Sequence, residues 1–164
     1  PAIKTKADQE AIMKAVLDDR IDVIATDHAP HTWEEKQNKY FSAPSGGPLV
    51  QHSLVAMLEF YKKGTISLGR IAAKMSHNPA ILFNIRERGY IREGYFADLV
   101  LVDLNDPWTV SKENILAKCG WSPFQGQTFS SKIDSTWVSG HRAYHLGTFD
   151  GSVKGFRLSF DRKK

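Results

Sequence analysis

The sequence of 164 residues is poor in cysteine and in long apolar stretches. Cys119 is the single cysteine, so an internal disulfide bond is excluded and a reducing compartment is favoured. No apolar run approaches the roughly 20 residues that span a bilayer, and no signal-peptide pattern is present. We therefore expect a cytoplasmic protein without a membrane partner.

Missing catalytic motifs argue against several classes of enzyme. The sequence has no GxSxG, the motif of many serine hydrolases, and no GxGxxG, the motif of dinucleotide-binding folds. It also lacks HExxH and HxH, two histidine pairs that supply zinc ligands in metalloenzymes. Cys119 lies at an expected helix end, where a cysteine is more often a small buried apolar residue than a nucleophile.

The charged residues do not form the pattern of a nucleic-acid-binding protein. The formal net charge is +4 and the calculated pI is about 9.2, but the basic residues are scattered and no basic stripe is present. The composition is 41% hydrophobic and 24% charged, as in an ordinary globular protein. We expect no nucleic-acid partner.

The chain begins at Pro1 rather than at a methionine, directly before an expected helix, so we expect a fragment of a longer protein. Thr5 and Asp8 have the spacing of a capping box. Apolar residues then recur at helical spacing, which predicts a helix over about 6–18.

The stretch that organises the rest of the sequence is IDVIATDHAPH, residues 21–31. Its apolar start, broken only by Asp22, predicts a buried strand, and Pro30 cannot continue a ladder, so the strand should end near Thr26 or Asp27. Helix, short turn and strand form one step of an α/β barrel or a doubly wound sheet. In a parallel barrel, Asp27 would lie at the catalytic edge, where it suits metal binding and proton transfer; a turn or capping role is the alternative.

The segment after this stretch is longer than a simple connection needs. Residues 32–41 are polar and aromatic, and residues 42–48 read SAPSGGP. Gly46 and Gly47 would allow backbone amides to approach a ligand closely, although a turn into the next helix explains the same residues.

Helical spacing continues to about residue 84. The face formed by Val50, Leu54, Met57, Leu58 and Tyr61 predicts a helix that ends before Gly64. Ser67 is expected to cap a second helix over 68–75. Asn78 and Pro79 predict an N-cap and a first helical position for a short third helix.

From Gly89 onward the pattern changes to short strands. Residues 97–104 predict one strand, and 133–138 with 141–144 predict a hairpin around Ser139-Gly140. Ser111 is expected to cap a small helix through Ala117, and 151–160 are expected to form an edge strand.

The other histidines give no clear chemistry. His52 and His77 fall on or beside expected helices and are interpreted as structural or surface residues. His141 and His145 can share one strand face, but without a third ligand they are interpreted as surface residues near a hairpin. His28 has no assigned role.

Several motifs, in order along the chain, resemble those of dihydroorotases in the amidohydrolase superfamily. Asp27-His28-Ala29-Pro30-His31 resembles the signature near the end of the eighth barrel strand. The others are Asn78-Pro79-Ala80, GYIREG at 89–94, ADLV at 97–100, SPFQG at 122–126 and TWVSG at 136–140. The resemblance implies an α/β fold: the C-terminal part of a (β/α)₈ TIM barrel over 1–85, followed by strands of a small β-sandwich domain over 86–164.

The resemblance also implies roles for individual residues. In the family the aspartate of this signature binds the metal and acts as general base and acid, which gives both roles to Asp27. The last histidine contacts the substrate carboxylate, which gives that role to His31, and backbone groups of the following loop contact the substrate, which points to Pro44, Ser45 and Gly46.

The implied activity is the reversible cyclisation of N-carbamoyl-L-aspartate to L-dihydroorotate in pyrimidine synthesis, with one or two zinc ions as cofactor. The family's HxH pair, carboxylated lysine and two further histidine ligands would lie upstream of Pro1, so we expect these 164 residues alone to bind metal weakly and to be inactive. Exposed strand edges favour association into a homo-oligomer.

Two alternatives stay open. Another cyclic amidohydrolase, an allantoinase or a dihydropyrimidinase (hydantoinase), would share the fold and the role of Asp27, although His31 argues against it. A non-catalytic dihydroorotase-like subunit, acting as a scaffold or partner, is the second alternative. The presence or absence of HxH in the complete protein separates these cases.

Overall fold

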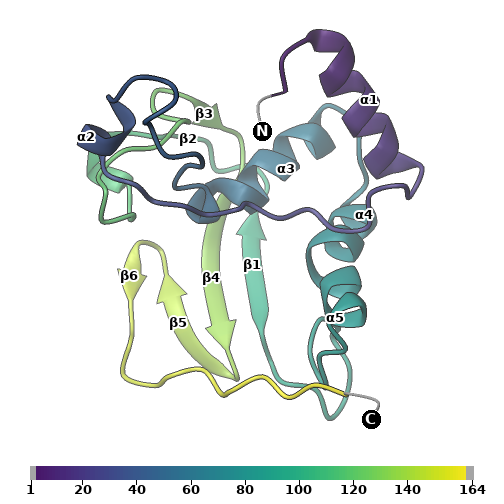
Figure 1. The fold of residues 1–164 in the computed structure, drawn as a ribbon. Helices are drawn as coiled ribbons and strands as arrows, with labels where there is room; N and C mark the ends of the chain where they lie inside the picture. Colours follow the sequence, from purple (N-terminus) through teal and green to yellow (C-terminus); the bar gives the residue numbers. More distant parts are fainter. Residues whose placement is uncertain (1–2, 162–164) are drawn as a thin grey trace.

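The computed structural model describes residues 3–161 and places all helical segments except η3 before the larger sheet along the chain (Figure 1). The helical segments are α1 (Lys6–Leu17), α2 (Trp33–Lys36), η1 (Val50–His52), α3 (Ser53–Lys62), α4 (Leu68–Ala72), η2 (Ala73–His77), α5 (Asn78–Leu82) and η3 (Lys112–Asn114). The strands are β1 (Leu99–Asp103), β2 (Trp108–Thr109), β3 (Thr128–Phe129), β4 (Lys132–Val138), β5 (His141–His145) and β6 (Thr148–Phe149). Within 3–161, no helix has the length and hydropathy needed to span a membrane.

The first helix forms where its capping pattern predicts. The Thr5 hydroxyl accepts a hydrogen bond from the Asp8 amide at 3.1 Å, and the Asp8 carboxylate accepts one from the Thr5 amide at 2.9 Å. This reciprocal capping box satisfies two amides that a helix start leaves unpaired. The helix ends at Leu17, and Asp19 then turns the chain with a φ of 63°.

The predicted helices over 68–75 and 78–84 are one continuous helical column. α4 passes through the π-helical turn η2 directly into α5, and the residue before Pro79 stays helical. Asn78 is therefore not an N-cap: its side-chain amide donates to the Asp22 carbonyl at 2.7 Å. The cap at Ser67 is confirmed, since its hydroxyl accepts from the Arg70 amide.

The segment 21–27 packs against the helices but is not a ladder strand. Ile21 and Ile24 are half-buried against a core of Val16, Leu58 and Ile71, to which Ile66 also belongs. The expected full burial is therefore wrong for the described residues, and so is the expected strand. No residue of 21–27 forms a β-bridge with another described residue. The nearest bridge joins His28, directly after the segment, to Gly47, and a strand needs a neighbour along its length.

Lys74 holds the start of this segment. Its side chain is 2% exposed, and its ammonium donates to the Ile21 carbonyl at 2.5 Å and pairs with Asp19 at 2.8 Å. The Lys74 carbonyl accepts from the Ile24 amide at 3.0 Å. A buried ammonium is stable only when its donors are used, and here they join the π turn to the incoming chain.

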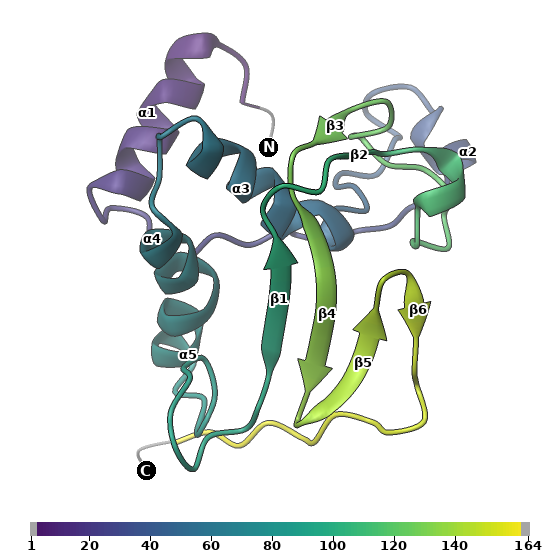
Figure 2. The ribbon, with the colours of Figure 1, turned by 180° about the vertical axis from the view of Figure 1, so that it is seen from behind.

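The larger sheet is antiparallel with the order β1-β4-β5-β6 (Figure 2). The predicted strand over 97–104 and the predicted hairpin are confirmed as β1, β4 and β5. Ser139 and Gly140 both have positive φ, 52° and 86°, as the primed turns of two-residue hairpins require.

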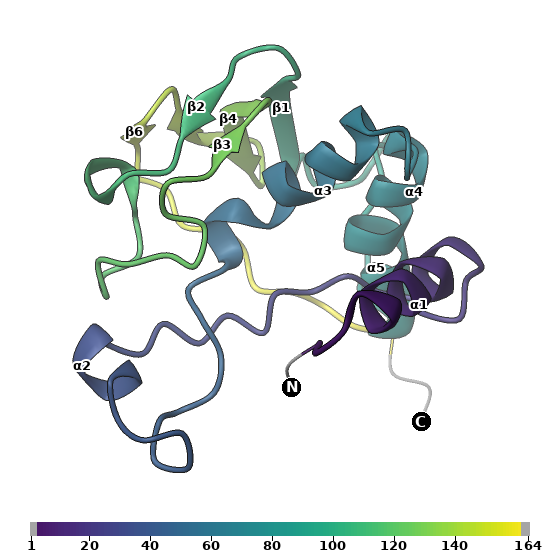
Figure 3. The same cartoon turned by 90° about the horizontal axis from the view of Figure 1, so that it is seen from above.

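A second, smaller layer lies at one end of this sheet (Figure 3). β2 pairs with β3, and Phe129 packs with Val110 and with Val55 of α3 in a second core. The helix expected from Ser111 to Ala117 is limited to the single turn η3, which Ser111 and Asn114 cap reciprocally. The side chain of Asn114 also donates to the Thr109 carbonyl, which ties the turn to β2.

The edge strand expected over 151–160 does not form. Residues 150–161 run beneath the larger sheet and back towards the end of α5 (Figure 1). Only Phe160 makes a bridge, to Ile85, and the Arg86 amide donates to the Ser159 carbonyl at 3.0 Å. Alternating apolar residues here reflect a segment laid over the surface, because the sheet edge is instead occupied by β6.

Candidate functional site

Asp27 lies where the extended segment turns. It is exposed and has a φ of 46°, in the left-handed region that aspartate tolerates better than most residues. The next residue, His28, accepts a hydrogen bond from the Val50 amide at its Nδ1, at 3.2 Å. His28 therefore has a structural contact to the start of η1, and Asp27 is left on the surface at the bend.

The loop over 44–47 packs directly against this bend. The Ala29 amide donates to the Gly47 carbonyl at 3.1 Å, and the two chains form the bridge between His28 and Gly47. Gly46 has a φ of 91°, and a Cβ built there would lie 2.6 Å from the Ala29 Cβ and 3.7 Å from the Asp27 carbonyl oxygen. Only glycine fits this approach, so Gly46 is required for the two loops to meet.

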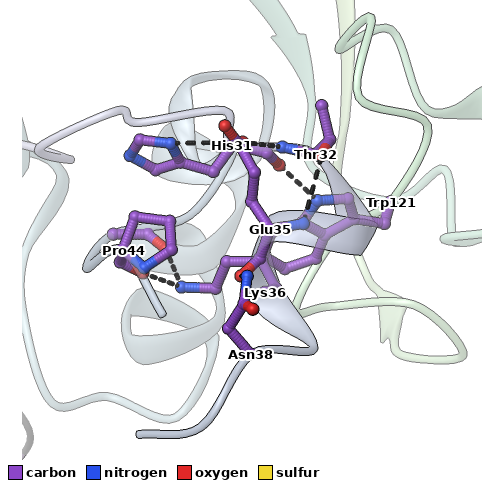
Figure 4. A network of polar contacts seen from close by, with 8 residues as sticks. His31, Thr32, Glu35, Lys36, Asn38, Pro44 and Trp121 are labelled. Carbon is purple, nitrogen blue, oxygen red and sulfur yellow. Dashed lines mark hydrogen bonds and ion pairs between the residues drawn. The ribbon is translucent and has the colours of Figure 1, made fainter. Parts of the chain in front are cut away.

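His31 is held by its main chain and by the short helix α2 (Figure 4). Trp121 donates from its indole nitrogen to the His31 carbonyl at 2.8 Å, and His31 Nδ1 lies 3.5 Å from the Glu35 carboxylate. Glu35 also accepts from the Thr32 amide and closes the capping box of α2. The carboxylate thus lies beside the imidazole, and the ring stays partly exposed.

Lys36 connects α2 to the 44–47 loop. Its ammonium donates to the Pro44 carbonyl at 2.6 Å and to the Gly46 carbonyl at 3.0 Å (Figure 4). The loop is therefore held on one side by Ala29 and on the other by Lys36. The structure thus brings together the main chain of the two segments that carry the residues named from the sequence, Asp27 and His31 on one and Pro44, Ser45 and Gly46 on the other.

The loop over 121–126 supports this cluster from the sheet side. A Cβ built on Gly47 would lie 3.7 Å from the Trp121 ring and 4.0 Å from Pro123, and Trp33 meets Trp121 edge to face. Ser122 is buried beneath them, where its hydroxyl accepts from the Phe124 amide at 3.1 Å. The motif near residue 122 thus joins the β2–β3 layer to the site.

His52 lies directly under Ser122. It is 1% exposed, its Nδ1 lies 3.4 Å from the Ser122 hydroxyl, and its ring stacks with Trp108 and with Phe129, each 6.0 Å away between ring centroids. Burial lowers the pKa of His52 below its ordinary value, because the apolar surroundings disfavour the charged ring. The interpretation of His52 as a structural residue agrees with this burial.

The described residues do not form a complete metal site. Among residues 3–161, no group of three histidine, cysteine, aspartate or glutamate side chains is placed to share an ion. A catalytic zinc takes about three protein ligands, so Asp27 offers at most one of them. The donor set present here does not fit a zinc ion by itself.

The other candidate groups have local partners. His141 contacts Asp150, and His145 lies 2.8 Å from the Ser135 hydroxyl, so these two rings make separate contacts on the sheet. His77 stacks on Tyr90 at 4.2 Å. Cys119 is half-buried, and its thiol contacts the Trp121 carbonyl.

Comparison with known proteins identifies the family. The model of the amidohydrolase family matches residues 4–143, most of the chain. The chain belongs to the amidohydrolase family. A dihydroorotase of Clostridium acetobutylicum is 38% identical to this amidohydrolase chain over 145 residues, which cover 88% of it and 34% of that protein. The resemblance to dihydroorotases read from the motifs is therefore confirmed.

Other relatives extend the comparison. The multifunctional protein pyr1-3 of Dictyostelium discoideum is 35% identical to this chain. The match covers 100% of this chain and only 7% of that much longer protein. Among solved structures, the L-hydantoinase (dihydropyrimidinase) from Arthrobacter aurescens has a TM-score of 0.84 at 26% identity, covering 91% of this chain and 34% of that one. The chain spans about a third of the length of the curated dihydroorotases that it matches.

Sequence reasoning missed Lys36, Trp121 and the helix α2. The signal for α2 was available, because Thr32 and Glu35 have the spacing of a capping box. No local pattern marks Lys36 or Trp121, since their partners lie 8 and 90 residues away along the chain.

Proposed function

We propose that these residues act in a dihydroorotase that interconverts N-carbamoyl-L-aspartate and L-dihydroorotate. The observation that carries the proposal is the meeting of three separate segments, 27–31, 44–47 and 121–123, at the bend that carries the exposed Asp27. The relatives named dihydroorotase match the chain across all three segments. Their alignment with most of the chain supports the choice of substrate.

The proposed roles follow from position. Asp27 is exposed at the bend, so its carboxylate can take a proton as water attacks the ring amide and return it to the leaving nitrogen. His31, whose ring is partly exposed, would donate to the substrate carboxylate. Backbone groups of Pro44, Ser45 and Gly46 would line the other side of the same substrate.

We propose zinc as the cofactor of the complete enzyme, with Asp27 as one ligand. Because the described residues supply no complete set of ligands, the others would come from residues beyond 3–161. Metal analysis of the full-length protein, with activity measured after chelation and after zinc is restored, tests this part. Full activity in the chelated, metal-free protein would contradict it.

The domain organisation is proposed on the same basis. Residues 1–85 would form the last strand and closing helices of a TIM barrel, and residues 86–164 would form strands of a β-sandwich. We further propose a cytoplasmic location, in keeping with the free thiol of Cys119, and association into homo-oligomers that cover the exposed edge strand β1.

The deciding experiment measures cyclisation of N-carbamoyl-L-aspartate by the full-length protein. Asp27→Ala and Asp27→Asn should each lower kcat/KM by about 10³-fold, since proton transfer is lost. Asparagine tolerates the positive φ of this position, so Asp27→Asn separates chemistry from backbone strain. Asp22→Ala is the matched control, because it removes another exposed carboxylate of the same segment, and it should keep the wild-type rate. An undiminished rate in Asp27→Asn would end the assignment.

A second candidate is a hydantoinase or dihydropyrimidinase, because the solved structures that match carry those names. Rates of the wild-type protein on dihydroorotate, dihydrouracil, hydantoin and allantoin distinguish the candidates. A preference for a ring without a carboxylate would favour the second one. Absence of turnover on all of them, in a protein that binds dihydroorotate, would favour a non-catalytic subunit.

A further inference from the structure

Lys36 lies beside a site expected to bind an anion, but its ammonium binds main-chain carbonyl groups. Its ammonium is half-buried and is used on two main-chain carbonyls, those of Pro44 and Gly46, at 2.6 and 3.0 Å. Two charge-assisted bonds to carbonyls two residues apart fix the path of the loop between them. Lys36 therefore sets the position of Ser45.

The geometry leaves the Ser45 amide available. Ser45 is exposed, and no described residue accepts a hydrogen bond from its amide. That amide belongs to the same peptide group as the Pro44 carbonyl, which accepts the shorter bond from Lys36. An ammonium on the carbonyl polarises the peptide and makes its N–H a stronger donor, because hydrogen bonds in a chain strengthen one another.

The contacts on the other side of the loop, made by Gly46 and Gly47, do not hold Ser45 in the way that Lys36 does. Gly46 is already in contact with Ala29, and Gly47 is paired with the segment that carries Asp27 and His31. A loop fixed on one side by backbone pairing and on the other by a single side chain depends on that side chain for its position.

We propose that Lys36 is a positioning residue for the anionic group of the substrate: through the Pro44 and Gly46 carbonyls it holds and polarises the Ser45 amide as a donor to a carboxylate. This inference rests on the proposed function, since it deepens the account of how the same site selects an anionic ring. It assigns Lys36 to substrate affinity and leaves the chemical step to Asp27.

The experiment uses the full-length protein and three variants: Lys36→Met, Lys36→Arg and Lys39→Met. Lys36→Met should raise KM for dihydroorotate about tenfold while kcat changes by about twofold or less, because a charge-assisted donor is lost without loss of the proton shuttle. Lys36→Arg keeps the charge and should recover most of the affinity. Lys39 is an exposed lysine three residues away, so Lys39→Met matches the change in charge and should leave KM unaltered.

Ligand binding separates this role from a merely structural one. Calorimetric titration measures the affinity for dihydroorotate and for its neutral carboxamide. In Lys36→Met the affinity for the acid should fall about tenfold, the factor expected for one charge-assisted bond, while the affinity for the carboxamide should not change. Equal losses for both ligands would show general disorder of the loop and overturn the inference, as would a fall in kcat at constant KM. Equal effects of Lys36→Met and Lys39→Met would assign the effect to net charge and overturn it too.

Failure of the proposed function gives a different result. A wild-type protein that neither binds nor turns over dihydroorotate rejects the proposed function itself. A wild-type protein that binds the acid, with Lys36→Met binding it equally well, rejects only the role of Lys36.

Discussion

The two ends of the segment 21–31 are attached to the molecule in opposite ways. Its start is held by the buried Lys74, which reaches Asp19 and Ile21 from inside the helical column. Its end is held at the surface, by the Gly47 carbonyl and by the indole of Trp121. The start of the segment therefore contributes to stability, and its end contributes to the shape of the site. Substitutions at the start should change the free energy of unfolding, and substitutions at the end should change activity.

The largest expected effect on stability lies at the buried end. Lys74→Met should lower the free energy of unfolding by about 3 kcal/mol, because it removes the buried ammonium's ion pair with Asp19 and leaves the carbonyl of half-buried Ile21 without its donor. Chemical denaturation of the full-length protein measures this loss. Below the unfolding transition, kcat/KM should stay near the wild-type value.

Lys118→Met is the control for Lys74→Met, since Lys118 is exposed and carries the same charge. We expect its stability to equal that of the wild-type protein. If Lys74→Met proves as stable as Lys118→Met, the buried attachment does not hold the segment and the comparison between the two ends fails.

A smaller effect of the opposite kind is expected at the exposed end. Gly46→Ala should lower kcat/KM about tenfold and stability by about 1 kcal/mol, because the new Cβ meets Ala29 and pushes the loops apart at an exposed place. Gly64→Ala is the matched control: it has a φ of 71° but no atom within 4 Å of the added Cβ. It should carry a similar backbone strain with unchanged activity, and equal activity losses in both variants would break the comparison.

The smallest effect concerns His52, the buried ring beneath the exposed end. The unfolded chain binds a proton near pH 6.5, the ordinary pKa of histidine, whereas burial holds the pKa of folded His52 below this value. Stability contributed by neutral His52 is therefore present above about pH 6.5 and is lost as the pH falls towards the folded-state pKa. Wild-type Tm should decrease more steeply over that range than the Tm of His52→Gln. The remaining histidines are common to both proteins, so parallel curves would show that His52 does not contribute.

Elements stabilised by local interactions could be predicted from the sequence. The capping box at Thr5, the cap at Ser67 and the hairpin turn at Ser139-Gly140 each depend on residues at most three positions apart. The same local reasoning failed where longer contacts decide. Asn78 has the pattern of an N-cap, but its amide bonds to the Asp22 carbonyl instead, and the helix runs through it.

The segment 21–27 shows why an apolar run does not determine a strand. Hydrophobic pattern reports that Ile21, Val23 and Ile24 seek burial, which the helical core provides in part. A ladder depends in addition on a partner strand, and within the described residues none pairs with 21–27; the first bridge, to Gly47, is made by His28 after the segment ends. The hydrophobic pattern therefore predicted that the segment packs on the core, but it wrongly predicted a β-strand.

The site was predicted in its residues but not in its supports. Asp27 and His31 were identified because an aspartate and histidines follow an apolar run, and the resemblance added the loop at Pro44–Gly46. Lys36 and Trp121 act through carbonyl groups of other residues, and no side-chain pattern in the sequence records which carbonyl a donor will find.

Attachment at both ends also fixes the register of the segment 21–31. The Ile24 amide is bound to the Lys74 carbonyl and the Ala29 amide to the Gly47 carbonyl, so the residues between them cannot slide along the helices. In extended chain, a slip of one residue turns every side chain to the opposite face. The two hydrogen bonds, at Ile24 and Ala29, thus determine the side of the bend on which Asp27 lies.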